Sequence, residues 1–113
     1  MAVWYYNYGM KRTARKDSNY IIYVATHNGN AYIGLTRKGK VTVKAAVKER
    51  WRKHISRARH EARDWTVYNY IRSGAWTEWE HEVLAVIRGR AEAYAYEREL
   101  VKLYEPELND QYL

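Results

Sequence analysis

Residues 20–37 read YIIYVATHNGNAYIGLTR and carry the strongest structural signal in the chain. Both ends of this stretch are rich in β-branched and aromatic residues, which favour strands. Asn28-Gly29 lies between them, and this dipeptide is preferred in two-residue hairpin turns because both positions accept a positive φ. The stretch therefore predicts an antiparallel hairpin with strands at 20–26 and 31–37. The turn sets a register in which residue 27 pairs with 30, residue 25 with 32 and residue 23 with 34.

Gly34 is unexpected inside a strand, because glycine weakens strands and often marks the close approach of another group. The predicted register sets Gly34 opposite Tyr23. Tyr32 lies on the same face as a diagonal neighbour of Tyr23, about 7 to 8 Å away at the usual sheet spacing. Two interpretations follow. Either the tyrosines face the core beside a glycine bulge, or they border a gap that matches a phosphate in size.

The sequence outside the hairpin predicts three helices and one more strand. Apolar periodicity and alternation place them at 43–63 (helix), 65–72 (helix), 79–89 (strand) and 91–104 (helix). Gly74 and Pro106 are placed to end the second and third helices. The order strand, strand, helix, helix, strand, helix predicts an α+β domain with a small antiparallel three-stranded sheet flanked by helices.

A chain of 113 residues with 47% apolar residues is long enough for one domain with a hydrophobic core and too short for two. We expect this domain at 20–113, after an aromatic and then basic N-terminal extension at 1–19. The absence of cysteine excludes disulfides and thiolate metal sites. No apolar run approaches the roughly 20 residues that cross a bilayer, and the N-terminus lacks the apolar stretch of a signal peptide. A cytoplasmic protein without a membrane partner is expected.

The charge of the chain favours a polyanionic partner. Lys and Arg number 20 against 13 Asp and Glu, which gives a net charge of +7 and a pI near 9.6. The 12 tyrosines and 5 tryptophans are expected mostly in the core and its rim, with some able to stack on bases. The extension at 1–19 is interpreted either as an extra edge strand followed by a solvated tail, or as a basic arm lying on phosphates.

Two further patterns place polar groups at apolar helix faces. Arg50 and His54 are four residues apart, at the edge of the apolar stripe of the first predicted helix. Such a pair is either a partly desolvated anion clamp or a solvated helix flank. Glu97 lies in the middle of the apolar arc of the last predicted helix, whereas Glu99 faces water. A buried carboxyl must be protonated, ion-paired with a group such as Arg50, or bound to a metal.

Taken in order, these motifs resemble those of the GIY-YIG nuclease superfamily. IIY at 21–23 stands at the position of the first tripeptide, and YIG at 32–34 is the second, intact. RWRKH at 50–54 resembles the arginine and histidine helix motif of the family's homing endonucleases. ERELVKLYEPELN at 97–109 resembles the glutamate segment and the Pro-x-x-Asn of its excision-repair subunit. The resemblance covers about residues 20–109.

The resemblance implies a metal-dependent endonuclease that hydrolyses phosphodiester bonds of DNA, most simply double-stranded DNA, with one Mg²⁺ or Mn²⁺. Six catalytic residues are implied: Tyr23, Tyr32, Arg50, His54, Glu97 and Asn109. Among them Glu97 is the single metal ligand, Arg50 stabilises the transition state, and either Tyr23 or His54 activates or orients the attacking water. The chain departs from the family in having Ile21 in place of glycine and a longer connection between Tyr32 and Arg50.

Basic residues near the implied site, and in the extension, are predicted to bind the nucleic acid. They are Arg37, Lys38, Lys40, Lys44, Lys11, Arg12, Arg15, Lys16, Lys53 and Arg57. The resemblance suggests a small free-standing nuclease of a phage or mobile element, or a restriction-like enzyme. Cutting both strands would favour a homodimer or sequential nicking. Two alternatives stay open: a nuclease-like module that binds DNA or protein without cutting, and a ribosome- or RNA-associated basic protein.

Overall fold

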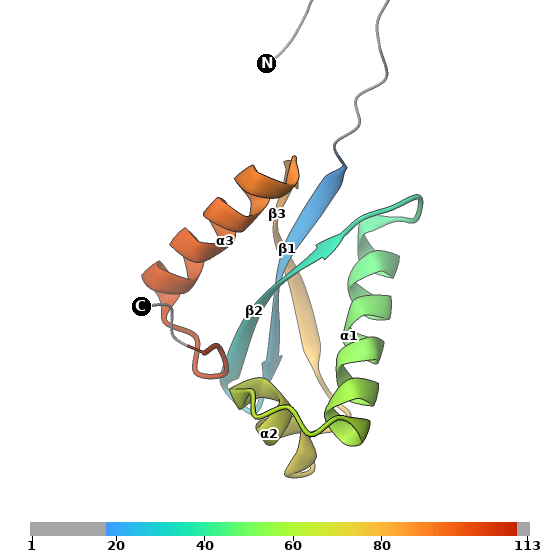
Figure 1. The fold of residues 1–113 in the computed structure, drawn as a ribbon, viewed down its shortest axis with the longest axis vertical. Coiled ribbons are helices and arrows are strands. Elements are labelled where there is room, and N and C mark those ends of the chain that lie inside the picture. Colours follow the sequence, from blue (N-terminus) through green and yellow to red (C-terminus); the bar gives the residue numbers. More distant parts are fainter. Residues whose placement is uncertain (1–17, 111–113) are drawn as a thin grey trace, which may run out of the picture.

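The structure of the protein is a computed structural model that describes residues 18–110 (Figure 1). Its elements follow the predicted order and confirm an α+β fold with a three-stranded antiparallel sheet. The elements are β1 (Asn19–His27), β2 (Asn30–Arg37), α1 (Val43–His60), α2 (Thr66–Arg72), β3 (Glu80–Arg88) and α3 (Arg90–Tyr104). The N-terminal extension is predicted at 1–19, but its last residue, Asn19, belongs to β1. Residues 1–17, on which both interpretations of the extension depend, lie outside the described range.

The hairpin of β1 and β2 has the predicted turn and register. Asn28 and Gly29 have positive φ values of 49° and 81°, as a two-residue turn of this type requires. The pairs are Tyr23 with Gly34, Ala25 with Tyr32 and His27 with Asn30. β3 pairs with the other side of β1, so the sheet order is β2-β1-β3. β1 is therefore the central strand, and β2 and β3 are the edges.

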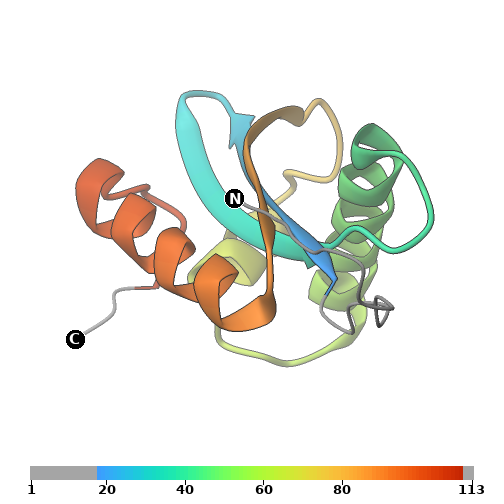
Figure 2. The same cartoon turned by 90° about the horizontal axis from the view of Figure 1, so that it is seen from above.

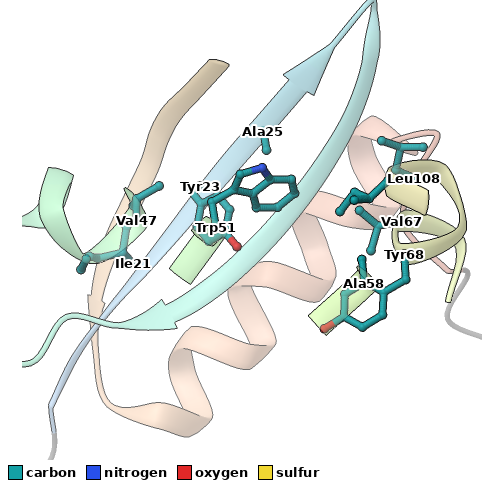
Figure 3. Packing of buried hydrophobic residues seen from close by; sticks show 11 residues of the cluster. Ile21, Tyr23, Ala25, Val47, Trp51, Ala58, Val67, Tyr68 and Leu108 are labelled. Carbon is teal, nitrogen blue, oxygen red and sulfur yellow. The ribbon is translucent and has the colours of Figure 1, made fainter. Parts of the chain in front are cut away.

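Helices cover both faces of the sheet (Figure 2). α1 and α2 lie on one face, called the α1 face, and α3 lies on the other, called the α3 face. The core on the α1 face includes Ile21, Tyr23, Ala25, Val47 and Trp51 (Figure 3). The core on the α3 face includes Ile22, Ile33 and Val101. Successive side chains of β1 thus enter opposite cores, as expected for a strand buried on both faces.

α1 ends earlier than predicted, at His60 instead of about Arg63. Glu61 is extended, with φ −111°, and its N–H donates to the carbonyl of Arg57. The Arg72 guanidinium from α2 donates to the carbonyls of Ala58, Glu61 and Arg63 and to the Asn69 side chain. Arg72 thus holds the backbone that connects the two helices through hydrogen bonds. The pattern of apolar residues, from which the helix end was predicted, carries no information about these bonds.

α3 buries a narrower face than predicted. Ala93, Glu97 and Val101 are buried, but Leu103 is 70% exposed and Tyr96 is also exposed. The helix therefore packs on the sheet mainly through residues spaced four apart, with Leu100 partly buried beside them. Within residues 18–110, none of the helices has the length and apolar character needed to cross a lipid bilayer.

Candidate active site

The Tyr23 phenol lies across Gly34, and this explains why a glycine stands in β2. A Cβ at Gly34 would lie 2.5 Å from Tyr23 Oη, 2.6 Å from Tyr23 Cζ and 2.8 Å from Tyr32 Cε2. The predicted phosphate-sized gap is therefore wrong, because the ring of Tyr23 itself fills it. The other interpretation is confirmed in part: both tyrosines face the core on the α1 face, but the predicted glycine bulge is wrong. β1 and β2 pair without a register shift, and the bulge lies between β1 and β3, beside Tyr23.

Tyr23 is fully buried, and its hydroxyl lies beside the Arg50 side chain without a well-formed hydrogen bond. Burial raises the pKa of Tyr23 well above its ordinary value, with a contribution from Tyr32, while the charge of Arg50 and its polar contact with the phenol act in the opposite direction. The phenol therefore stays protonated at neutral pH. A protonated phenol can donate a hydrogen bond to a phosphate or a water, but it cannot take a proton from that water.

His54 is also part of the core, with 3% of its surface exposed. Its ring stacks on Trp51, with centroids 5.1 Å apart, and meets the rings of Tyr32 and Tyr68 edge-on at 5.6 and 5.7 Å. Burial, followed by the charges of Arg50 and Arg57, lowers the pKa of His54 to about 3. The imidazole is therefore neutral at physiological pH and a weak base.

Four buried polar atoms without a hydrogen-bond partner gather around these residues. Within residues 18–110 they are Tyr23 Oη, Arg50 Nε, Trp51 Nε1 and His54 Nδ1. Ring contacts join three of their owners, since Trp51 lies 6.2 Å from Tyr23 and 5.1 Å from His54 between centroids. Buried polar groups in proteins are nearly always paired, and leaving one unpaired costs roughly 1–3 kcal/mol. This set is called the unpaired cluster below.

Glu97 points inward with 8% of its surface exposed, while Glu99 is exposed, and both predictions are confirmed. Of the three predicted states of this carboxyl, the ion pair with Arg50 is not formed, and none of the ion pairs among residues 18–110 includes Glu97. Burial raises the pKa of Glu97, and the charge of Arg98 partly opposes the shift. α3 lies on the face opposite α1, yet the Glu97 charge is near enough to contribute to the raised pKa of Tyr23.

A metal at Glu97 would have few protein ligands. No group of three or more His, Cys, Asp or Glu side chains that could hold a metal ion occurs among the described residues. An unpaired, desolvated carboxyl fits a hard cation such as Mg²⁺, which keeps several waters and takes substrate phosphate oxygens beside one or two carboxylates. Glu97 therefore fits the single-ligand arrangement that the family resemblance implies.

Asn109 contacts the backbone of β2. The N–H of Ile33 donates to Asn109 Oδ1 at 2.7 Å, and Asn109 Nδ2 donates to the Ile33 carbonyl at 2.9 Å. Both polar atoms of this side chain are thus engaged on the residue between Tyr32 and Gly34. We assign Asn109 a positioning role instead of the predicted catalytic one, because its amide holds the strand and not a reacting group.

A basic groove of about 510 Å³ lies between the end of β2 and α1. Its cationic lining is Arg37, Lys38, Arg50, Lys53 and Arg57. Four of the residues predicted to bind nucleic acid are therefore brought together with Arg50 of the site. Lys40 lies outside this groove, and Lys44 lines a different one. The other four, Lys11, Arg12, Arg15 and Lys16, lie outside the described residues.

Trp51 and Tyr68 are site residues that the sequence reasoning missed. Trp51 lies between Arg50 and His54 in the sequence of α1; its ring contacts both His54 and Tyr23, and its Nε1 belongs to the unpaired cluster. The available signal was chemical: an indole N–H needs a partner when it is buried.

Compared with known proteins, the chain matches no family model, no curated protein and no solved structure.

Proposed function

We propose that the protein is a metal-dependent DNA endonuclease of the GIY-YIG type. The observation that carries this proposal is the unpaired cluster, which shares Arg50 with the basic groove. The buried Glu97 carboxyl lies on the other side of the sheet, and its charge still contributes to the raised pKa of Tyr23. Unpaired buried groups are costly, so their concentration at one place supports a ligand that completes them. A phosphate with a bound cation offers the acceptor oxygens and the positive charge that these groups lack.

Arg50 has the central role, because it belongs to both the groove and the unpaired cluster. Its planar guanidinium can bind two phosphate oxygens and stabilise the negative charge that develops during hydrolysis. Tyr23, which stays protonated, donates a hydrogen bond that orients the attacking water or the phosphate. Tyr32 packs against both Trp51 and His54, which stack on each other, and keeps these rings in place.

Glu97 is the residue that would hold Mg²⁺ or Mn²⁺. The cation would supply charge neutralisation at the phosphate and at the leaving oxygen. The remaining basic side chains of the groove bind the neighbouring phosphates, so that the DNA backbone runs along α1. This arrangement is sequence-independent, because phosphate contacts position a protein on DNA and carry no base information.

Binding of DNA without cleavage is the second candidate function. It is favoured by the pKa values of Tyr23 and His54, which leave neither side chain suited to accept a proton near pH 7, and by the complete burial of Tyr23. The same fold, groove and charge would serve both functions. The two are separated only by whether bound DNA is cut.

Nicking of supercoiled plasmid by the purified chain, with Mg²⁺, with Mn²⁺ and with EDTA, tests the proposal. We expect metal-dependent nicking that falls by about 100-fold or more in Glu97→Gln, since the isosteric amide removes the anionic ligand. Glu99→Gln is the matched control, because Glu99 is exposed on the same helix. Arg50→Lys should lose about 100-fold through loss of the planar guanidinium, while Arg52→Lys, which is exposed, should not. Plasmid that is bound but uncut under every metal would establish the second function instead.

A further inference from the structure

Trp65 occupies an exposed position that neither helix capping nor core packing explains. It is the N-cap residue of α2, where Ser, Thr, Asp or Asn is favoured, and its side chain makes no capping hydrogen bond. The residue is 42% exposed, although an indole is among the largest apolar groups that a fold can bury. A substantial part of this ring is therefore open to a ligand.

Ring contacts connect Trp65 to the unpaired cluster. The ring of Tyr68 lies 5.0 Å from that of Trp65 and 5.7 Å from that of His54, measured between centroids. Tyr68 is fully buried, so its ring has a fixed place in contact with both. His54 belongs to the unpaired cluster. Only one ring thus separates the exposed indole from the candidate site.

Charged side chains connect Trp65 to the basic groove as well. Arg57, which lines the groove, pairs with Glu61 at 3.9 Å, and Glu61 pairs with Arg63 at 3.0 Å. The guanidinium carbon of Arg63 lies 4.8 Å from the centroid of the Trp65 ring. A nucleic-acid strand that leaves the groove at Arg57 therefore has Arg63 and then Trp65 next to it.

Arg63 covers one side of the indole but is held there weakly. Its ion pair with Glu61 joins side chains that are 57% and 40% exposed, and exposed pairs of this kind contribute little to stability. The guanidinium can move to a phosphate, which it binds through a planar set of donors. The side of the ring that it leaves free can then stack on a base, as aromatic side chains do in proteins that bind single strands.

We propose that Trp65 stacks on an unpaired base of DNA whose backbone lies in the basic groove, so that the site prefers DNA with unpaired nucleotides. Within a duplex each base is stacked on its neighbours, and an indole reaches its face only after the base has left the stack. Every base has a π face, so the selection is for structure and not for sequence. The inference rests on DNA binding in the groove, which both candidate functions share.

Trp76 is a matched control within the same chain. It is 46% exposed, and the guanidinium carbon of Arg59 lies 4.2 Å from the centroid of its ring. Arg59 is two residues from Arg57 on α1, so the two arginines project from opposite sides of the helix, and Arg59 does not line the basic groove. Trp76 therefore offers the same chemistry as Trp65, away from the candidate site.

Binding of two DNAs in the presence of EDTA, which prevents metal-dependent cutting, is the first test. One is a blunt duplex, and the other is the same duplex with a central run of mismatched bases. Trp65→Leu should weaken binding of the mismatched DNA about tenfold, or about 1.4 kcal/mol, and change binding of the blunt duplex by less than about twofold. Trp65→Phe should keep most of the affinity because it keeps a ring, and Trp76→Leu should change neither DNA.

The second test uses the unaltered chain, so it does not depend on how a variant folds. With 5-iodouracil in the mismatched run, irradiation cross-links the base to an aromatic side chain in contact with it. Trypsin cuts after Arg63, Arg72 and Arg88, which places Trp65 in peptide 64–72 and Trp76 in peptide 73–88. We expect the cross-link in peptide 64–72, at Trp65.

Equal losses for the two DNAs in Trp65→Leu, an equal loss in Trp76→Leu, or cross-links confined to peptide 73–88 would each overturn the inference. Neither test requires cleavage. A chain that shows the expected binding and never cuts would refute the nuclease proposal alone. A chain that nicks plasmid with Mg²⁺ and binds both DNAs equally well, with or without Trp65, would refute this inference alone.

Discussion

The two edges of the sheet are built differently. The outer side of β2 is bound by the segment after α3: the N–H of Leu108 donates to the Ala31 carbonyl, the N–H of Ala31 donates to Glu107, and Asn109 makes two bonds with Ile33. The outer side of β3 has no such cover within residues 18–110. The covered edge carries Gly34 and Tyr32 of the candidate site. The edge whose backbone is held by hydrogen bonds is thus β2, which positions side chains of the candidate site. The edge without such bonds is β3, on the other side of β1.

Gly34→Ala should break the covered edge from within and have the largest effect. The new methyl group would overlap the Tyr23 phenol and the Tyr32 ring, and the fully buried Tyr23 has no open space into which to move. We expect a loss of about 3 kcal/mol or more in the free energy of unfolding, measured with urea. Gly39→Ala is the control, because it meets no atom within 4 Å and should cost only about 1 kcal/mol through its positive φ. Similar losses in both variants would contradict the close packing of Tyr23 on Gly34.

Acid should lower the free energy of unfolding through His54, whose ring packs against Tyr32 of the covered edge. The pKa of this residue is about 3 when folded and near 6.5 when unfolded, so the unfolded chain binds a proton first as the pH falls. The stability associated with the neutral, buried imidazole is fully present above pH 6.5 and is lost as the pH falls from 6.5 to about 3. Between pH 7 and pH 4 the free energy of unfolding should fall by up to about 3 kcal/mol. Urea unfolding at both pH values should show a smaller acid loss for His54→Gln than for the exposed-site variant His60→Gln. Equal losses would show that His54 does not cause the pH dependence.

Asn109→Ala tests the covered edge from outside. The substitution leaves the N–H and the carbonyl of Ile33 without partners, and we expect a loss of about 2 kcal/mol in the free energy of unfolding. Asn109→Asp keeps the acceptor for the N–H and should lose about half as much. No change in either variant would mean that water replaces the side chain, and that the segment after α3 does not fix β2.

The smallest effect is expected from charge removal beside the site. Lys53→Ala combined with Arg57→Ala removes two cations from the basic groove, so DNA affinity should fall about tenfold and the slope of its salt dependence should decrease by about 2. Lys40→Ala with Lys44→Ala removes the same charge outside this groove and should leave the slope nearly unchanged. Equal changes in both pairs would show that DNA contacts the loop after β2 as well.

Local patterns predicted the hairpin, its register and the burial of Glu97, because each depends on residues adjacent in the chain or on one helix face. Asn28-Gly29 alone determines the pairing of Tyr23 with Gly34. The filled space over Gly34 was not predictable in this way, since it depends on the direction of a side chain from the neighbouring strand. Whether Trp51 belongs to the candidate site, and whether Glu97 forms an ion pair, likewise depend on how α1, β1 and α3 pack together.

The hydrogen bonds of Arg72 have a consequence for how the molecule opens. One guanidinium holds carbonyls from the last turn of α1 and from the connection to α2, together with Asn69. Separation of the two helix ends would break the hydrogen bonds from Arg72 to both of them. We therefore expect the end of α1 and the whole of α2 to open as one cooperative unit, whose amide protons exchange with solvent together. His54 and Tyr68 belong to the two helices that this unit joins, so its closure keeps the rings of the candidate site in contact.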